Sequence, residues 1–158
     1  MRTLFIALRA LIFASGFVLL WGWLALSVRA FDRGMALPSW TAVPGIILMV
    51  VGGILALTCV GEFVLRGRGI PAPFDSPRAF VAIGPYRYLR NPMYVGGFTM
   101  LVGFSLYEHS ISMLLFSLAW LLAVHLFVVL YEEPTLREKF GATYTGYCNA
   151  VARWIPKP

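Results

Sequence analysis

Four stretches of this chain are almost free of charged side chains, and they restrict the fold more than any other feature. They run approximately over residues 4–28, 45–65, 94–107 and 111–131. A helix needs roughly 20 predominantly apolar residues to cross the hydrocarbon core of a bilayer. Three stretches reach that length, and 94–107 is short. We therefore predict an all-α fold: a polytopic membrane protein with about four transmembrane helices and a C-terminal amphipathic helix.

Composition excludes a soluble domain of this length. Apolar residue types make up 59% of the 158 residues and charged types 13%, whereas a soluble domain has roughly 25% charged residues. We expect one integral membrane domain over 1–158. The net charge of +6 comes mostly from arginines between apolar stretches, which is typical of membrane topology rather than nucleic-acid binding. Two separate cysteines, Cys59 and Cys148, provide neither a metal site nor a disulfide framework.

The long connection over residues 66–92 is rich in arginine and proline. Too many prolines interrupt it for a helix, and its apolar content predicts a packed, functional loop. Positive loops face the cytoplasm, and four spans place both termini on the same side as this loop. We expect the cytoplasmic membrane as the location. The tail, 132–158, repeats apolar residues at helical spacing from Leu136 to Tyr147, which predicts a helix on the membrane surface or against the loop.

The segment from Gly84 to Gly97 combines turn formers, aromatic rings, arginines and an asparagine. Pro92 suits the first position of a helix, and a helix N-terminus presents free N–H groups to an anion. A nucleotide-like ligand with a carboxylate fits these features. The alternative is an interfacial loop whose arginines bind lipid phosphates and whose tyrosines belong to an aromatic belt.

An acidic pair, Glu132 and Glu133, directly follows the last apolar stretch. The pair either marks the water boundary or holds an ammonium group or ribose hydroxyls. Pro134 predicts a break in the helix after it. His125 lies seven residues before Glu132, which places both on one face of a regular helix. As an ionisable residue inside a span, His125 is a candidate catalytic residue; otherwise it is a neutral histidine bonded to a neighbouring helix.

Two separated blocks of this sequence together resemble a known family. The first is Gly84-x-Tyr86-x3-Arg90-Asn91-Pro92-x-Tyr94-x-Gly96, and the second is Glu132-Glu133 followed by Phe140-Gly141-x2-Tyr144-x2-Tyr147. This pattern resembles the isoprenylcysteine carboxyl methyltransferases and the related phospholipid methyltransferases. The resemblance covers about half of the chain. It implies a membrane enzyme that transfers a methyl group from S-adenosylmethionine to a lipophilic carboxylate, amine or thiol.

The resemblance also implies which residues bind the cofactor. These residues lie in the loop, in the tyrosine-rich motif and after the last span: Arg78, Ala79, Phe80, Val81, Tyr86, Arg90, Asn91, Pro92, Met93, Tyr94, Glu132 and Glu133. His125 and Glu132 are the candidate catalytic residues, and we expect no metal. The partners implied are the membrane and a lipid or other lipophilic substrate, with no nucleic acid.

Two positions depart from the family pattern. Asn91 stands where histidine is common, and an asparagine side chain still donates and accepts hydrogen bonds. Val128 stands where eukaryotic members carry an arginine that faces the substrate carboxyl group, which argues against a prenylcysteine carboxylate. Two other functions stay open: a membrane sterol-type reductase that uses NADPH, and a non-enzymatic scaffold that binds anionic lipid. Titration with both cofactors separates them.

Overall fold

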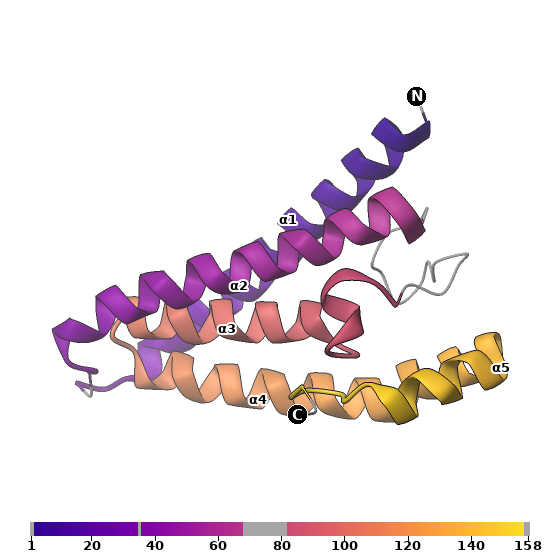
Figure 1. Cartoon of the computed structure of the whole chain (residues 1–158). Coiled ribbons are helices and arrows are strands. Elements are labelled where there is room, and N and C mark those ends of the chain that lie inside the picture. The colour runs from indigo at the N-terminus through magenta and orange to yellow at the C-terminus, as the bar shows by residue number, and fades with distance from the viewer. Residues whose placement is uncertain (1, 35, 68–81, 157–158) are drawn as a thin grey trace.

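The computed structural model describes residues 2–34, 36–67 and 82–156, and their regular structure is helical (Figure 1). The main helices are α1 (Arg2–Val28), α2 (Ala42–Glu62), α3 (Pro92–Tyr107), α4 (Ile111–Phe127) and α5 (Glu133–Ala150). Short π-helical segments follow α2 at Phe63–Gly67 and α4 at Val128–Glu132, and a 3-10 turn spans Gly84–Arg87. The prediction of an all-α fold is confirmed.

Three of the described helices are long and apolar enough to cross a membrane: Phe5–Phe31, Ser39–Leu65 and Ile111–Ala150. Helix α3 has 16 residues, so at a rise of 1.5 Å per residue it is about 24 Å long. This is shorter than the roughly 30 Å of a hydrocarbon core. It nevertheless lies between α2 and α4 and runs alongside both (Figure 1), so the four apolar stretches form one bundle.

Helices α2 and α3 pack closely because glycines face glycines. A Cβ added at Gly52 would lie 2.6 Å from the carbonyl oxygen of Gly96, and one at Gly45 would lie 2.6 Å from that of Gly103. Small residues let membrane helices approach until their backbones touch. The close approach extends seven residues along both helices, from Gly45 to Gly52 and from Gly96 to Gly103.

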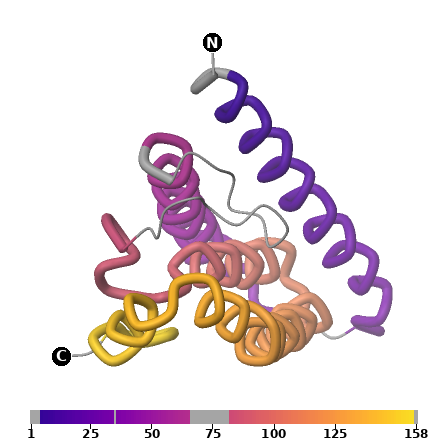
Figure 2. Tube along the Cα trace, turned by 90° about the vertical axis from the view of Figure 1, so that its right-hand side faces the viewer, coloured from indigo at the N-terminus to yellow at the C-terminus, as the bar shows by residue number. Residues whose placement is uncertain are grey.

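Helix α1 packs less closely against the bundle than α2 does against α3. Its contacts gather around Phe17 and Trp21, whose rings meet Trp120 of α4 edge to face with centroids 6.5 Å and 5.9 Å away. Nearer its N-terminus, Ala10 is buried against Val60 of α2. Figure 2 shows α1 at the side of the other helices. Most of its surface is available to lipid.

The turn between α3 and α4 closes the end of the bundle opposite Tyr94 and Glu132. A tight turn is present at 108–110, and its Glu108 pairs with Arg29 after α1. The backbone N–H of Ser112 donates to the Asp32 carboxylate over 2.7 Å. These contacts tie α1 to the start of α4, so the C-terminal end of α1 is anchored.

The chain reverses direction at Gly141 rather than at Pro134. The helical path continues from α4 through the π-helical segment into α5, where Pro134 occupies the first turn and needs no amide partner. Gly141 adopts φ 53° and ψ −128° inside α5, a conformation favoured by glycine. The predicted break at Pro134 is therefore wrong. The helix bends at Gly141 instead, and the tail forms a helical hairpin.

Candidate active site

The centre of the candidate site joins the first turn of α3 to the end of the fourth apolar stretch. The Tyr94 hydroxyl donates a hydrogen bond to Oε2 of Glu132 over 3.0 Å. Glu132 ends the π-helical segment Val128–Glu132, and π-helical turns are frequent at functional sites. A carboxylate has about four acceptor positions, so Glu132 keeps the capacity to bind a further donor.

Tyr86 approaches the same carboxylate from the 3-10 turn before α3. Its ring packs edge to face on Phe63, with centroids 5.4 Å apart. Burial raises the pKa of the Tyr86 phenol well above its ordinary value, and the neighbouring Cys59 and the negative charge of Glu132 raise it further. Tyr86 therefore stays protonated, and Tyr86, Tyr94 and Glu132 lie in one cluster.

Asn91 and Pro92 form the start of α3 and are buried. Asn91 precedes the helix with 8% of its surface exposed, and its side-chain Nδ2 has no hydrogen-bond partner among the described residues. Pro92 takes the first helical position. The first N–H groups of a helix have no helical acceptor and attract anions. The start of α3 therefore offers donors, and Tyr94 of its first turn binds the acceptor Glu132. Met93 instead packs against Ala10 and Val60.

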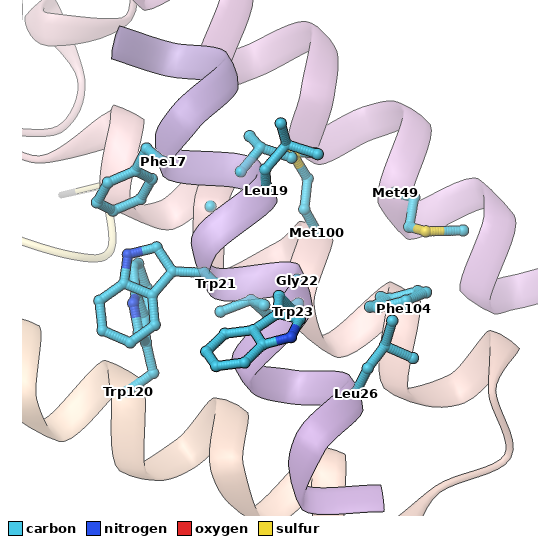
Figure 3. Close-up of a pocket in the computed structure, with 13 residues that line it drawn as sticks. Phe17, Leu19, Trp21, Gly22, Trp23, Leu26, Met49, Met100, Phe104 and Trp120 are labelled. Atoms are coloured by element: carbon cyan, nitrogen blue, oxygen red, sulfur yellow. The ribbon is translucent and has the colours of Figure 1, made fainter.

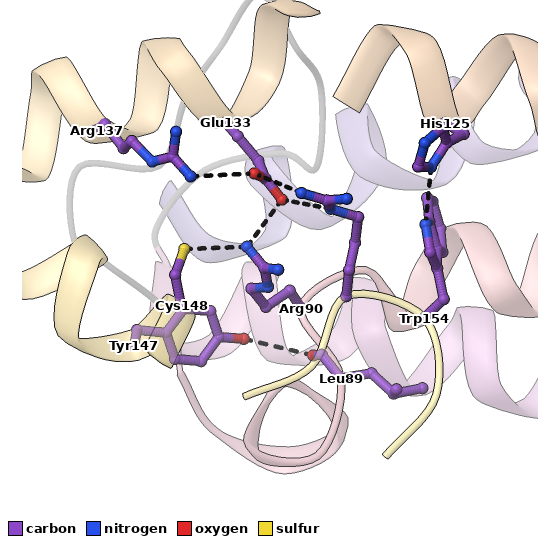
Figure 4. A network of polar contacts seen from close by, with 9 residues as sticks. Leu89, Arg90, His125, Glu133, Arg137, Tyr147, Cys148 and Trp154 are labelled. Atoms are coloured by element: carbon purple, nitrogen blue, oxygen red, sulfur yellow. Dashed lines mark hydrogen bonds and ion pairs between the residues drawn. The ribbon is translucent and has the colours of Figure 1, made fainter. Parts of the chain in front are cut away.

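Glu133 forms the centre of a second cluster, which Figure 4 shows. Its side chain is 4% exposed and accepts from Nη1 of Arg90 at 2.8 Å and Nε of Arg153 at 2.7 Å. Arg137 lies 3.4 Å away on the next helical turn. Burial alone raises the pKa of the Glu133 carboxyl, but the hydrogen bond from Arg153 and the three positive charges lower it below its ordinary value. Glu133 is therefore ionised at neutral pH.

The tail beyond Gly141 folds back over the segment from Tyr86 to Arg90. The Tyr147 hydroxyl donates to the carbonyl oxygen of Tyr86 over 2.6 Å, and the Arg90 amide donates to the carbonyl oxygen of Ala152 over 2.8 Å. The expectation that the tail folds back on the loop region is correct for the part of the loop that the structure describes. Together with Arg153, these bonds hold the tail across the segment that carries Tyr86 and Arg90.

His125 contacts the tail rather than the Tyr94–Glu132 pair. The indole N–H of Trp154 donates to Nδ1 of His125 over 3.0 Å, so in the neutral ring Nε2 carries the proton and neither nitrogen is a free acceptor. Glu132 is roughly 10 Å further along the helix. The π-helical turn between them adds one residue per turn, so the expectation of one shared face is wrong.

The structure thus brings together some of the expected site residues and separates others. Tyr86, Tyr94 and Glu132 converge, and Arg90 and Glu133 form an adjacent ion cluster. The expected cofactor residues Arg78, Ala79, Phe80 and Val81 lie outside the described residues. Val128 is fully buried. Sequence reasoning missed the roles of Arg153 and Trp154, because nothing in the sequence marks the reversal at Gly141 that brings them to Glu133 and His125.

Comparison with known families decides the class of protein. Residues 40–143 match the family described as phospholipid methyltransferase, and this match covers more than half of the chain. The chain belongs to the phospholipid methyltransferase family. The resemblance read from its two motif blocks is therefore confirmed. A comparison with curated proteins finds no significant match.

The part of the chain that matches the phospholipid methyltransferase family contains the core of the site. It runs from before α2 to just beyond Gly141 and includes Tyr94, Glu132 and Glu133. Helix α1 and the tail residues Arg153 and Trp154 lie outside it. Membership implies an integral membrane methyltransferase that acts on lipid-type substrates.

Proposed function

We propose that this protein transfers a methyl group from S-adenosylmethionine to a lipophilic acceptor at the membrane surface. The observation that carries this proposal is the Tyr94–Glu132 pair in a phospholipid methyltransferase family member. The buried donor of Asn91 precedes Tyr94 at the start of the same helix. Glu132 suits the ammonium group or the ribose hydroxyls of the cofactor. Asn91 and the N-terminus of α3 suit its carboxylate. The residues present therefore fit the cofactor.

When bound, S-adenosylmethionine supplies a methyl group already activated on a sulfonium centre. The protein then needs mainly to position the two reactants and to exclude water. Tyr94 orients the Glu132 carboxylate, and Tyr86 contributes a neutral, buried wall to the site. A carboxylate acceptor needs no base, whereas an amine or a thiol must lose a proton. His125 accepts that proton only after its bond to Trp154 breaks.

Arg90 and Glu133 support the site from outside it in this proposal. The Glu133 carboxylate already receives charge-assisted hydrogen bonds from two arginines and lies close to a third, so the cofactor would have to displace a guanidinium to reach it. We therefore assign both residues to positioning the tail and the start of α3. The arginines around Glu133 also favour the cytoplasmic side for this end of the bundle.

The test is calorimetric titration of the purified protein in detergent micelles with S-adenosylmethionine and, separately, with NADPH. Binding of S-adenosylmethionine that Glu132→Gln weakens supports the proposal, and binding of NADPH alone supports the reductase. A protein that binds neither, and whose affinity for anionic lipid fades with salt, is a scaffold. Incubation with methyl-labelled S-adenosylmethionine and a membrane lipid extract then identifies the acceptor.

A further inference from the structure

An apolar cavity in the bundle lies away from the polar clusters. It has a volume of about 450 Å³ and is lined by side chains and glycines of α1, α2, α3 and α4 (Figure 3). Its walls include Phe17, Trp21, Gly22, Met49, Met100 and Trp120. Ligand pockets commonly have volumes of roughly 300–1,000 Å³. An almost wholly apolar lining excludes a charged cofactor and suits a hydrocarbon.

The cavity opens toward the lipid side of α1. Leu19 and Trp23 line it, yet they are 72% and 64% exposed. Helix α1 is a candidate membrane span, so its exposed side chains face hydrocarbon rather than water. A lipid chain can therefore enter the cavity sideways without crossing a polar surface.

One face of α3 connects the cavity to the candidate active site. Tyr94, Gly97, Leu101 and Phe104 follow one another at spacings of three and four residues, which place them on one helix face. Tyr94 holds Glu132 at the top of this face, and the other three residues line the cavity. From Tyr94 to Phe104 the face is about 15 Å long, which is enough for a long hydrocarbon chain.

We propose that this cavity binds the hydrocarbon chain of the methyl acceptor and holds the acceptor's polar end near Tyr94 and Glu132. The inference rests on the proposed function and deepens it, because it assigns the acceptor's chain to one cavity between α1, α2, α3 and α4. Because the chain moves from lipid hydrocarbon into an apolar cavity, close packing against the cavity walls, rather than removal from water, supplies the binding energy. The polar clusters above the cavity are then left to hold the cofactor and the reacting headgroup.

Gly22 and Gly16 of α1 provide a matched pair of variants. A Cβ added at either position meets no atom within 4 Å, so a leucine side chain starts in open space at both. Only Gly22 lines the cavity. Gly22→Leu therefore fills the cavity, whereas Gly16→Leu makes the same chemical change elsewhere on the same helix.

The first experiment detects the chain without relying on activity. The protein is reconstituted into phosphatidylcholine vesicles that contain a phosphatidylethanolamine with a diazirine near the end of one acyl chain, and the cross-linked peptides are mapped after illumination. We expect labels on the cavity-lining peptides around Trp21 and Trp120, lost in Gly22→Leu and kept in Gly16→Leu. Labels spread evenly over the lipid-facing surface, or unchanged in Gly22→Leu, would overturn the inference.

The second experiment compares acceptors of different chain length. Dioleoyl and dihexanoyl phosphatidylethanolamine are methylated in mixed micelles by the wild type and both variants. We expect Gly22→Leu to raise KM for the dioleoyl lipid about tenfold, since small changes in an apolar pocket have effects of that size, and to leave the dihexanoyl KM unchanged. Equal effects on both lipids contradict the inference, and if neither lipid is methylated the cross-linking map decides. Absence of S-adenosylmethionine binding refutes the proposed function alone.

Discussion

The hydroxyl of Tyr94 and the carboxylate of Glu132 are 3.0 Å apart although 38 residues separate them in the chain. This bond ties the start of α3 to the end of the fourth apolar stretch. Both residues lie where apolar helices give way to polar segments, which is where a cofactor from water and a lipid from the bilayer can meet. The bond is therefore the first target for mutation.

Tyr94→Phe removes one hydrogen-bond donor and keeps the ring. Glu132 then loses the group that orients it, and a hydrogen bond to a charged group contributes about 1.5–3 kcal/mol. We expect the affinity for S-adenosylmethionine to fall about tenfold, as a loss of 1.4 kcal/mol implies. Calorimetric titration measures it. Tyr131→Phe is the control, because Tyr131 is next to Glu132 and largely exposed; equal affinities in all three proteins would refute the assignment.

Glu133→Gln removes the charge that three arginines share. Arg90 is then left nearly buried, with 12% of its side chain exposed, and without its carboxylate. Loss of one partner from a buried ion pair destabilises a protein by about 3–5 kcal/mol. We expect the lower end of that range, because Arg153 is partly exposed. We expect the tail after Gly141 to become sensitive to limited proteolysis. Glu138→Gln makes the same substitution at an exposed position five residues further along and should leave the tail protected.

The same ion cluster predicts a loss of stability in acid. The pKa of Glu133 in the folded protein is below its ordinary value of 4.5, so the charged carboxylate stabilises the fold at every pH above 4.5. This contribution is lost as the pH falls through the lower, folded-state pKa. We expect the difference in melting temperature between the wild type and Glu133→Gln to be constant near neutral pH and to shrink below pH 4.5. A difference that stays constant into acid would mean that another group carries the effect.

The sequence predicted those parts of the fold that depend on local composition. Long apolar stretches specify α1, α2 and α4, because a buried backbone in lipid must satisfy its own hydrogen bonds. The motif blocks also singled out Tyr94 and Glu132, which the structure joins by a hydrogen bond, because their residue types and spacing follow a recognisable family pattern. These features are properties of continuous segments and can be read without knowing how the segments pack.

The parts that sequence reasoning missed depend on backbone geometry and distant contacts. Gly141 belongs to the second motif block, but only the structure shows that the tail reverses there. That reversal brings Arg153 to Glu133 and Trp154 to His125. The π-helical turn before Glu132 likewise has no sequence signature, and it changes which face His125 shares. A regular helix was the wrong assumption at both places.

The contact between α2 and α3 supports a final prediction, because two adjacent glycines differ in their surroundings. A Cβ at Gly52 lies 2.6 Å from a backbone oxygen of α3, whereas one at Gly53 meets only the flexible Met100 sulfur at 3.9 Å. Gly52→Ala must push the helices apart, and such overpacking costs about 1–3 kcal/mol. Separation of α2 from α3 also moves the start of α3, where Tyr94 meets Glu132.

We therefore expect Gly52→Ala to lower the melting temperature in detergent and to weaken S-adenosylmethionine binding together. Gly53→Ala makes the same substitution on the same helix and should keep both near the wild-type values, or raise stability slightly through the better helix propensity of alanine. Thermal unfolding and calorimetric titration of the two variants measure both effects. Equal stability of the two variants would contradict the prediction, because it would mean that α2 and α3 are not in backbone contact at Gly52.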